Sequence, residues 1–200
     1  SEYLWMDEAS IRNLDLLPIE RRGVRRGGDL LSVLDTTCTP MGGRLLREWI
    51  LRPLARAEPI RARHEAVEEL FRDRTLLADL RSLLSEIRDI ERLIARLAAG
   101  SGNARALKAL GRSLAVVPPV RTLLAESRAS LLKESVDSLS DEADLVEELE
   151  RALEDELPLT VREGGLIRAG YHPELDELRR AATEGKQWLA EYQAREIERT

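Results

Sequence analysis

Few residues in this 200-residue sequence could do chemistry, since it holds two histidines and a single cysteine. Zinc sites draw on several Cys, His or carboxylate ligands, so His64, His172 and Cys38 could bind zinc only by recruiting carboxylates. His64 falls on the apolar face of an expected helix, which favours a packed, hydrogen-bonded histidine over a metal ligand. Cys38 has no histidine near it in sequence, so a structural thiol is favoured over a nucleophile.

Motifs for nucleotide binding and acid–base catalysis are also missing from the sequence. Gly185-Lys186 lacks both the upstream glycine and the following Ser or Thr of a phosphate-binding loop. The carboxylates of residues 147–154 follow the spacing of a helix surface, which favours a solvated face over a catalytic pair. We therefore expect this chain to be no enzyme, with no catalytic, cofactor-binding or metal-binding residue.

A cluster of four arginines set among glycines is the candidate for a nucleic-acid contact. It consists of Arg21, Arg22, Arg25 and Arg26. One interpretation is a loop that contacts phosphates. The other is a solvated connector, which the composition favours.

The charge is unevenly spread along a chain whose net charge is −6. Residues 1–128 carry 22 Lys and Arg against 18 Asp and Glu, whereas residues 129–200 carry 9 against 19. DNA affinity needs cations that neutralise phosphates, so we expect the acidic part to act as a strut. No apolar run approaches the ~20 residues of a membrane span. A cytoplasmic location with no membrane partner is therefore the expectation.

The elements that would position these residues are helices, and residues 30–54 are expected to form their hub. Thr39 can cap a helix whose first residue is Pro40, and Pro53 ends that helix. Its apolar residues share one face at helical spacing. We predict that other helices pack on this hub, which consists of Leu34, Thr39, Met41, Leu45, Leu46 and Trp49.

Five further helical segments follow the hub, with short connections that favour antiparallel neighbours. One is lined by Ile60, His64, Val67 and Phe71, and Asn103 caps another. Residues 126–141 are rich in serine and predict a subdomain border. Ser140 is expected to cap the next helix, and residues 159–168 hold the single stretch where a small hairpin is considered. We divide the chain into 1–128, 129–172 and 173–200.

The last segment predicts one unbroken helix over residues 173–200. Its apolar positions alternate at intervals of three and four, which is the pattern of a heptad seam. No second long helix in the sequence could cover this seam, so self-association through it is one possibility. The seam residues are Leu175, Leu178, Ala182, Gly185, Leu189 and Tyr192.

Five blocks of this sequence, in order, resemble the core (lever) domain of the MutS family of DNA mismatch-recognition ATPases. They lie at residues 7–16, 30–54, 89–100, 163–179 and 196–200. The longest reads LLSVLDTTCTPMGGRLLREWILRPL. Two departures stand out: Asn103 is followed by Ala104 where the family usually has proline, and His172 stands where it often has Asp or Asn.

The resemblance implies an all-α, multi-helix bundle of the MutS core-domain type with a long C-terminal lever helix leading toward a clamp. It implies a structural role in mismatch repair, in which the lever transmits conformational change between DNA and an ATPase domain. ATP and Mg would belong to the parent protein and no cofactor to this segment. The implied partners are mismatched double-stranded DNA, a second parent subunit, and the parent's own connector, clamp and ATPase domains.

Two alternatives stay open at this stage. A MutS-related protein acting in recombination would share this core, and only a mismatch-reading domain elsewhere would discriminate the two. A free-standing helical module that binds DNA through residues 21–26 is the other alternative. A salt-dependent DNA titration would discriminate it from the structural lever.

Overall fold

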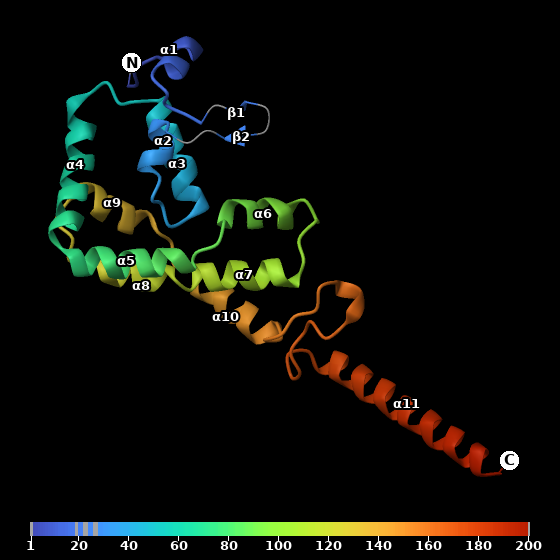
Figure 1. Ribbon diagram of the computed structural model, residues 1–200. Helices are drawn as coiled ribbons and strands as arrows, with labels where there is room; N and C mark the ends of the chain where they lie inside the picture. The colour runs from blue at the N-terminus through green and yellow to red at the C-terminus, as the bar shows by residue number, and fades with distance from the viewer. Residues whose placement is uncertain (1, 19, 22–23, 26–27, 200) are drawn as a thin grey trace.

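The computed structural model describes residues 2–18, 20–21, 24–25 and 28–199 as a chain of helices with an elongated outline (Figure 1). The all-α class is therefore confirmed. The α-helices are α1 (Glu8–Asn13), α2 (Leu30–Leu34), α3 (Pro40–Leu51), α4 (Ala57–Arg72), α5 (Arg74–Glu86), α6 (Ile90–Ala98), α7 (Ala104–Leu114), α8 (Val117–Leu124), α9 (Ser130–Ser138), α10 (Ala143–Ala152) and α11 (Pro173–Arg199). A 3-10 turn, η1, spans Val161–Glu163.

Most helices begin at a side chain that satisfies a free backbone amide. Thr39 accepts a hydrogen bond from the amide of Gly42, and Asn103 accepts one from the amide of Ala106, so both predicted caps are confirmed. The predicted cap at Ser140 is wrong. Its hydroxyl donates to the Glu142 carboxylate instead, and α10 begins after Glu142 without a side-chain cap.

The apolar core lies in the middle of the body, away from the predicted hub. One cluster joins α5 to α8 and is completed by side chains of α4 and α9; its buried members are Leu80, Val116, Val120 and Leu124. A second cluster joins α7 to α10 and the chain that follows α10; its buried members are Ala104, Ala152, Leu153 and Leu157. Burial of apolar surface is the main stabilising term, so these two clusters hold the fold together.

The prediction that residues 30–54 form a buried hub is wrong. None of the residues of α2 or α3 is buried, and the side chains of Leu34, Leu45 and Trp49 are 49%, 48% and 37% exposed. The spacing correctly indicated an amphipathic helix from Pro40, but the period of a helix does not say whether anything covers its apolar face. Thr39, Met41 and Leu46 are half-buried, because α2 and α3 pack on each other.

A second correction concerns α4. Three of the four residues of the predicted stripe face solvent, with Val67 65% and Phe71 61% exposed and His64 also exposed, whereas Ile60 is half-buried. The helix instead turns Ala66 and Leu70 inward. Helix α4 packs on α5 and α9. This tertiary contact, and not the helical spacing, decides which of the two apolar faces of α4 is covered.

Strand pairing lies elsewhere than predicted. Residues 159–168 hold η1 and no hairpin; Ile167 forms a single bridge with Leu153. Among the described residues, β1 (Glu20–Arg21) and β2 (Val24–Arg25) pair in the antiparallel direction. The predicted subdomain border at residue 129 does not match the packing, because α9, which follows the border, packs on α4 and α8, which precede it.

The long C-terminal helix stands away from the body (Figure 1), and α11 runs unbroken over 27 residues. At 1.5 Å per residue it is ~40 Å long. The extensively packed helix pairs of the described residues are α4 with α5 and α9, α5 with α8, α8 with α9, and α7 with α6 and α10. Since α11 is in none of these pairs, it forms a projecting arm.

Candidate functional site: a tethered helix pair and a projecting arm

Helices α2 and α3 are joined to the body by arginine side chains. Arg44 of α3 reaches the start of α6, where its Nη1 and Nη2 donate to the two carboxylate oxygens of Asp89, each at 2.8 Å. Nε of Arg44 also donates to Glu91 at 3.1 Å. A guanidinium matches a carboxylate in this two-bond geometry, which fixes orientation as well as distance. The Arg44 hydrogen bonds lower the pKa of Asp89 to about 2.

Two more arginines complete the tether. The guanidinium of Arg63, in α4, lies 3.5 Å from the centre of the Trp49 ring, which is a cation–π contact. Arg81, in α5, donates to the backbone carbonyl of Thr36 at 3.0 Å. The α2–α3 pair is therefore held by side-chain contacts with α4, α5 and α6.

This helix pair also leaves several apolar side chains open to solvent. We call this set the α2–α3 patch; its members are Leu30, Val33, Leu34, Leu45 and Trp49, each more than a third exposed. Exposed apolar side chains that lie close together in sequence are candidates for a contact with another protein surface. The patch is thus the first candidate interaction site of this chain.

The base of the arm is held by side chains of α11 itself. Arg179 donates to the carbonyl of Ile167 at 2.8 Å, and Asp176 accepts from the amide of Gly170 at 2.8 Å. Both contacts fall on residues 166–171, which we call the arm base. Tyr171 of the arm base donates in turn to Glu148 of α10, and this raises the pKa of Tyr171.

Along the arm itself the predicted seam is open. Leu175 is half-buried near the arm base, whereas Leu178, Ala182, Gly185, Leu189 and Tyr192 are exposed. Trp188 is exposed beside this seam and stacks on Tyr192, with ring centres 5.5 Å apart. The seam is therefore a second candidate interaction site, in the described part of a helix that no other described helix covers.

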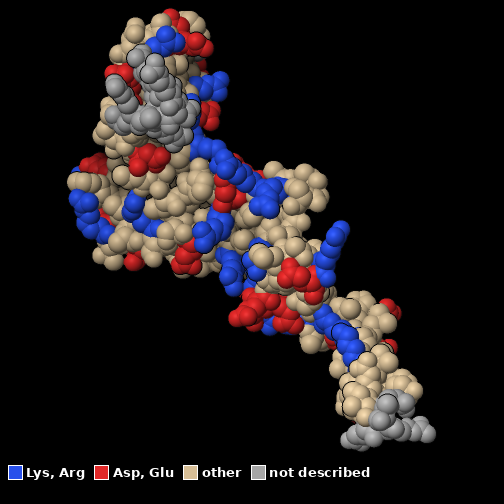
Figure 2. Space-filling model, turned by 45° about the vertical axis from the view of Figure 1, so that its right-hand side comes forward, with Lys and Arg blue, Asp and Glu red and all other residues tan. Residues whose placement is uncertain are grey.

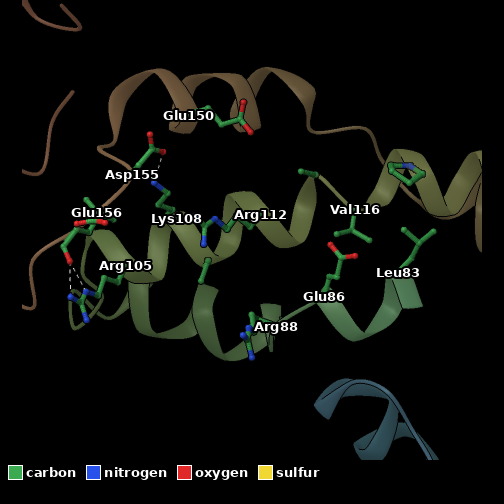
Figure 3. A pocket seen from close by; sticks show the side chains of 14 residues that line it. Leu83, Glu86, Arg88, Arg105, Lys108, Arg112, Val116, Glu150, Asp155 and Glu156 are labelled. Atoms are coloured by element: carbon green, nitrogen blue, oxygen red, sulfur yellow. Dashed lines mark hydrogen bonds and ion pairs between the residues drawn. The ribbon is translucent and has the colours of Figure 1, made fainter. Parts of the chain in front are cut away.

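A hollow of about 940 Å³ opens between the end of α5, α7 and the chain after α10 (Figure 3). Arg105 and Lys108 line it and donate to the carbonyls of Leu157 and Glu154. Four cations and four carboxylates share its wall, which consists of Glu86, Arg88, Arg105, Lys108, Arg112, Glu150, Asp155 and Glu156 among others. Balanced charge of this kind does not select an anion or a cation, so the hollow does not indicate a ligand class.

The predicted nucleic-acid contact falls mostly outside the described residues. Arg22 and Arg26 lie outside them, and of Arg21 and Arg25 the structure describes the backbone, in β1 and β2. The face of the molecule in Figure 2 shows blue and red side chains interspersed over the body. A phosphate contact at residues 21–26 stays a prediction.

The residues weighed for chemistry lie apart from one another. Cys38 is half-buried before α3, His64 is exposed on α4, and His172 is exposed just before α11. No group of three or more His, Cys, Asp or Glu that could hold a metal occurs in the described residues. Within that same part of the chain, no helix is both long and apolar enough to cross a membrane.

Sequence reasoning missed the side chains that hold the tether and the arm base. The side chains of Arg63, Arg81, Asp155 and Arg168 look like ordinary surface charges in the sequence, because their partners lie 13 to 47 residues away. A single sequence carries no signal for such distant pairs. Arg44 and Glu91 lie in two of the blocks that resemble the MutS core, but nothing in the sequence marks them as partners.

Comparisons with known proteins identify relatives over nearly the whole chain. Residues 9–199 match the family described as MutS domain III. The chain is 49% identical over its full length to a protein of Symbiobacterium thermophilum named DNA mismatch repair protein MutS, and 44% identical to a protein of that name from Methanosarcina acetivorans. A Myxococcus xanthus protein of the same name is 46% identical over 98% of the chain.

The chain spans 23%, 23% and 22% of the lengths of these three proteins, so it corresponds to less than a quarter of each. The matched family covers nearly every residue of the body and of the arm. From this match and these identities it follows that the chain belongs to the MutS domain III family.

Proposed function

We propose that this chain is the mechanical core segment of a DNA mismatch repair protein, and that it relays conformational change between a DNA-holding clamp and an ATPase domain. Its relatives carry the name DNA mismatch repair protein MutS. In such a protein, ATP with Mg would act in the separate ATPase domain, and mismatched duplex DNA would be held by a pair of parent subunits. This segment then contributes geometry rather than catalysis.

The observation that carries the proposal is the arm. A single helix of 27 residues leaves the body at a base fixed by its own Asp176 and Arg179. A rigid helix ~40 Å long turns a small rotation at one end into a displacement at the other, about 7 Å for each 10°. Such an element can be biased from both of its ends, which coupling between two sites requires.

The fulcrum of this lever is the body core and not Trp49. Leu80, Val120 and Leu124 are buried in the interface of α5 and α8, whereas Trp49 lies at a partly exposed cation–π contact. The α2–α3 patch is then the surface that would receive a neighbouring domain, either connector or ATPase. The arm seam would receive the partner that completes the lever on the way to the clamp.

The proposal is tested by breaking the arm in a complete mismatch repair protein that contains this segment. Gln187 is exposed in the middle of α11, and proline there removes a helix hydrogen bond and kinks the rod. We expect Gln187→Pro to retain both mismatch binding and ATP hydrolysis while ATP no longer triggers release from the mismatched duplex. Gln187→Ala is the matched control and should behave as the unsubstituted protein.

Release that still follows ATP in the Gln187→Pro protein, at the rate of the alanine control, would refute the relay. A protein in recombination rather than repair would show the same coupling but without preference for mismatched over matched duplex. The same binding assay therefore discriminates the two roles.

A further inference from the structure

One carboxylate joins the body to the arm base. Asp155 lies just after α10, and its Oδ1 accepts from Nζ of Lys108 in α7 and from Nη2 of Arg168 in the arm base, each at 3.1 Å. Lys108 hydrogen bonding and the charge of Arg168 lower the pKa of Asp155. The two cations come from segments 60 residues apart, so this carboxylate is where they meet.

Both cations are also anchored to backbone carbonyls. Lys108 donates to the carbonyl of Glu154 at 2.6 Å, and Arg168 donates twice to the carbonyl of Leu153, at 3.2 and 3.1 Å. Lys108 is only 17% exposed, whereas Asp155 is 78% exposed. The cations are thus held in place by the fold, and Asp155 is the exposed link between them.

The arm base continues this link into α11. The Arg168 amide donates to the carbonyl of Ala152 at 2.8 Å, which ties the arm base to the end of α10. The neighbouring carbonyl, of Ile167, accepts from Arg179 of α11. A continuous series of contacts therefore runs from α7 through Asp155 and Arg168 to the first turns of the arm (Figure 3 shows its start, at Lys108 and Asp155).

We infer that Asp155 is a positioning residue that sets the direction of α11 relative to the body, by holding Arg168 of the arm base against Lys108 of α7. The inference deepens the proposed function and rests on it for its consequence, since the direction of the arm is what a relay would change. Asp155 holds no ligand in this role. It acts through Arg168 and Arg179.

The test measures arm direction in the 200-residue chain itself. Cys38 is replaced by serine, and cysteines at Ala95 of α6 and Gln193 of α11, both exposed, carry a donor and an acceptor dye for single-molecule energy transfer. Residue 193 lies ~30 Å along the arm, so a 10° change in arm direction moves it by about 5 Å. We expect Asp155→Asn to shift or broaden the distribution of transfer efficiencies.

Arg168→Gln removes the other side of the same link and should give a matching change. Glu156→Gln is the matched control, because Glu156 is the next residue in sequence and its exposed carboxylate forms no hydrogen bond or ion pair with the described residues. Far-UV circular dichroism verifies that helix content is retained. If Asp155→Asn loses helix content, Arg168→Gln decides the question.

A distribution in Asp155→Asn and Arg168→Gln identical to that of Glu156→Gln would overturn the inference. That result would leave the relay itself standing, because the Gln187→Pro experiment reads coupling and not arm direction. Conversely, a changed arm direction together with intact ATP-triggered release in Gln187→Pro would retain the positioning role and reject the relay. The two failures are therefore distinguishable.

Discussion

Arg44 donates two hydrogen bonds of equal length, 2.8 Å each, to the carboxylate of Asp89, which lies 45 residues further along the sequence. The pair joins the exposed α2–α3 unit to α6, and Asp89 also accepts from the Arg92 amide at the start of that helix. One carboxylate therefore both begins a helix and holds a second one. This two-bond contact helps to fix the orientation of the α2–α3 unit.

The pH dependence of this contact follows from the pKa of Asp89. Its value in the folded chain is about 2, below the usual 3.8, so the contact stabilises the fold above pH ~4 and that stabilisation is lost as the pH falls toward 2. We predict that Arg44→Gln raises the pKa of Asp89 toward 3.8 in a carboxyl-resolved NMR titration. Arg47→Gln, on the same helix but exposed, is the control. An unchanged Asp89 pKa in Arg44→Gln would contradict the pairing.

Two leucines discriminate the observed core from the predicted hub. Leu80 is 8% exposed in the α5–α8 cluster, whereas Leu45 of α3 is 48% exposed. We predict that Leu80→Ala lowers the free energy of unfolding by about 2–5 kcal/mol, and that Leu45→Ala lowers it by about 1 kcal/mol or less. Urea unfolding followed by circular dichroism measures both. If both variants lost the same free energy of unfolding, Leu45 would be as much part of the core as Leu80, and the observed core would be contradicted.

The start of α9 is capped by a side chain from another helix. Glu69 of α4 accepts from the amides of Arg128 and Ala129, at 2.9 and 2.7 Å, where α9 has no cap of its own. Burial alone would raise the pKa of Glu69, but the two amide hydrogen bonds and the charges of Arg128 and Lys133 together lower it. The cap is therefore present near neutral pH and is lost as the pH falls through this lowered pKa.

We predict that Glu69→Ala costs about 1 kcal/mol of stability, the usual value of a lost helix cap. Hydrogen exchange should show faster exchange at the first amides of α9 in this variant. Glu65→Ala, one turn earlier and exposed, is the matched control and should leave α9 unchanged. Equal protection of α9 in both variants would show that the cap contributes nothing.

The helices could be predicted from the sequence, but their packing could not. Helix starts could be predicted at Thr39, Pro40 and Asn103, because helix capping acts within three residues of sequence. The length of the arm could be predicted from its apolar residues, which recur at intervals of three and four. Whether Phe71 or Ala66 of α4 faces inward depends on α5 and α9, which local spacing does not encode. The contacts of Arg44 and Asp155 are equally non-local, so the candidate sites emerge only with the fold.

Binding of DNA by this chain alone tests the alternative of a free-standing module. The chain carries a net charge of −6, so we predict non-specific binding weaker than about 1 μM at physiological salt. Fluorescence anisotropy with matched and mismatched duplexes, each at low and physiological salt, measures it. Replacing all four arginines of residues 21–26 by glutamine should reduce the residual binding. Tight binding with a preference for the mismatch would favour the module.

Small-angle X-ray scattering of the 200-residue chain, extrapolated to infinite dilution to exclude association through the arm seam, tests the central claim that a rigid arm projects from a helical body. A compact domain of 200 residues has a radius of gyration of about 16 Å. We predict a clearly larger value, with a distance distribution that has a long tail. A value near 16 Å with a symmetric distribution would mean that α11 folds back on the body, and would contradict the account.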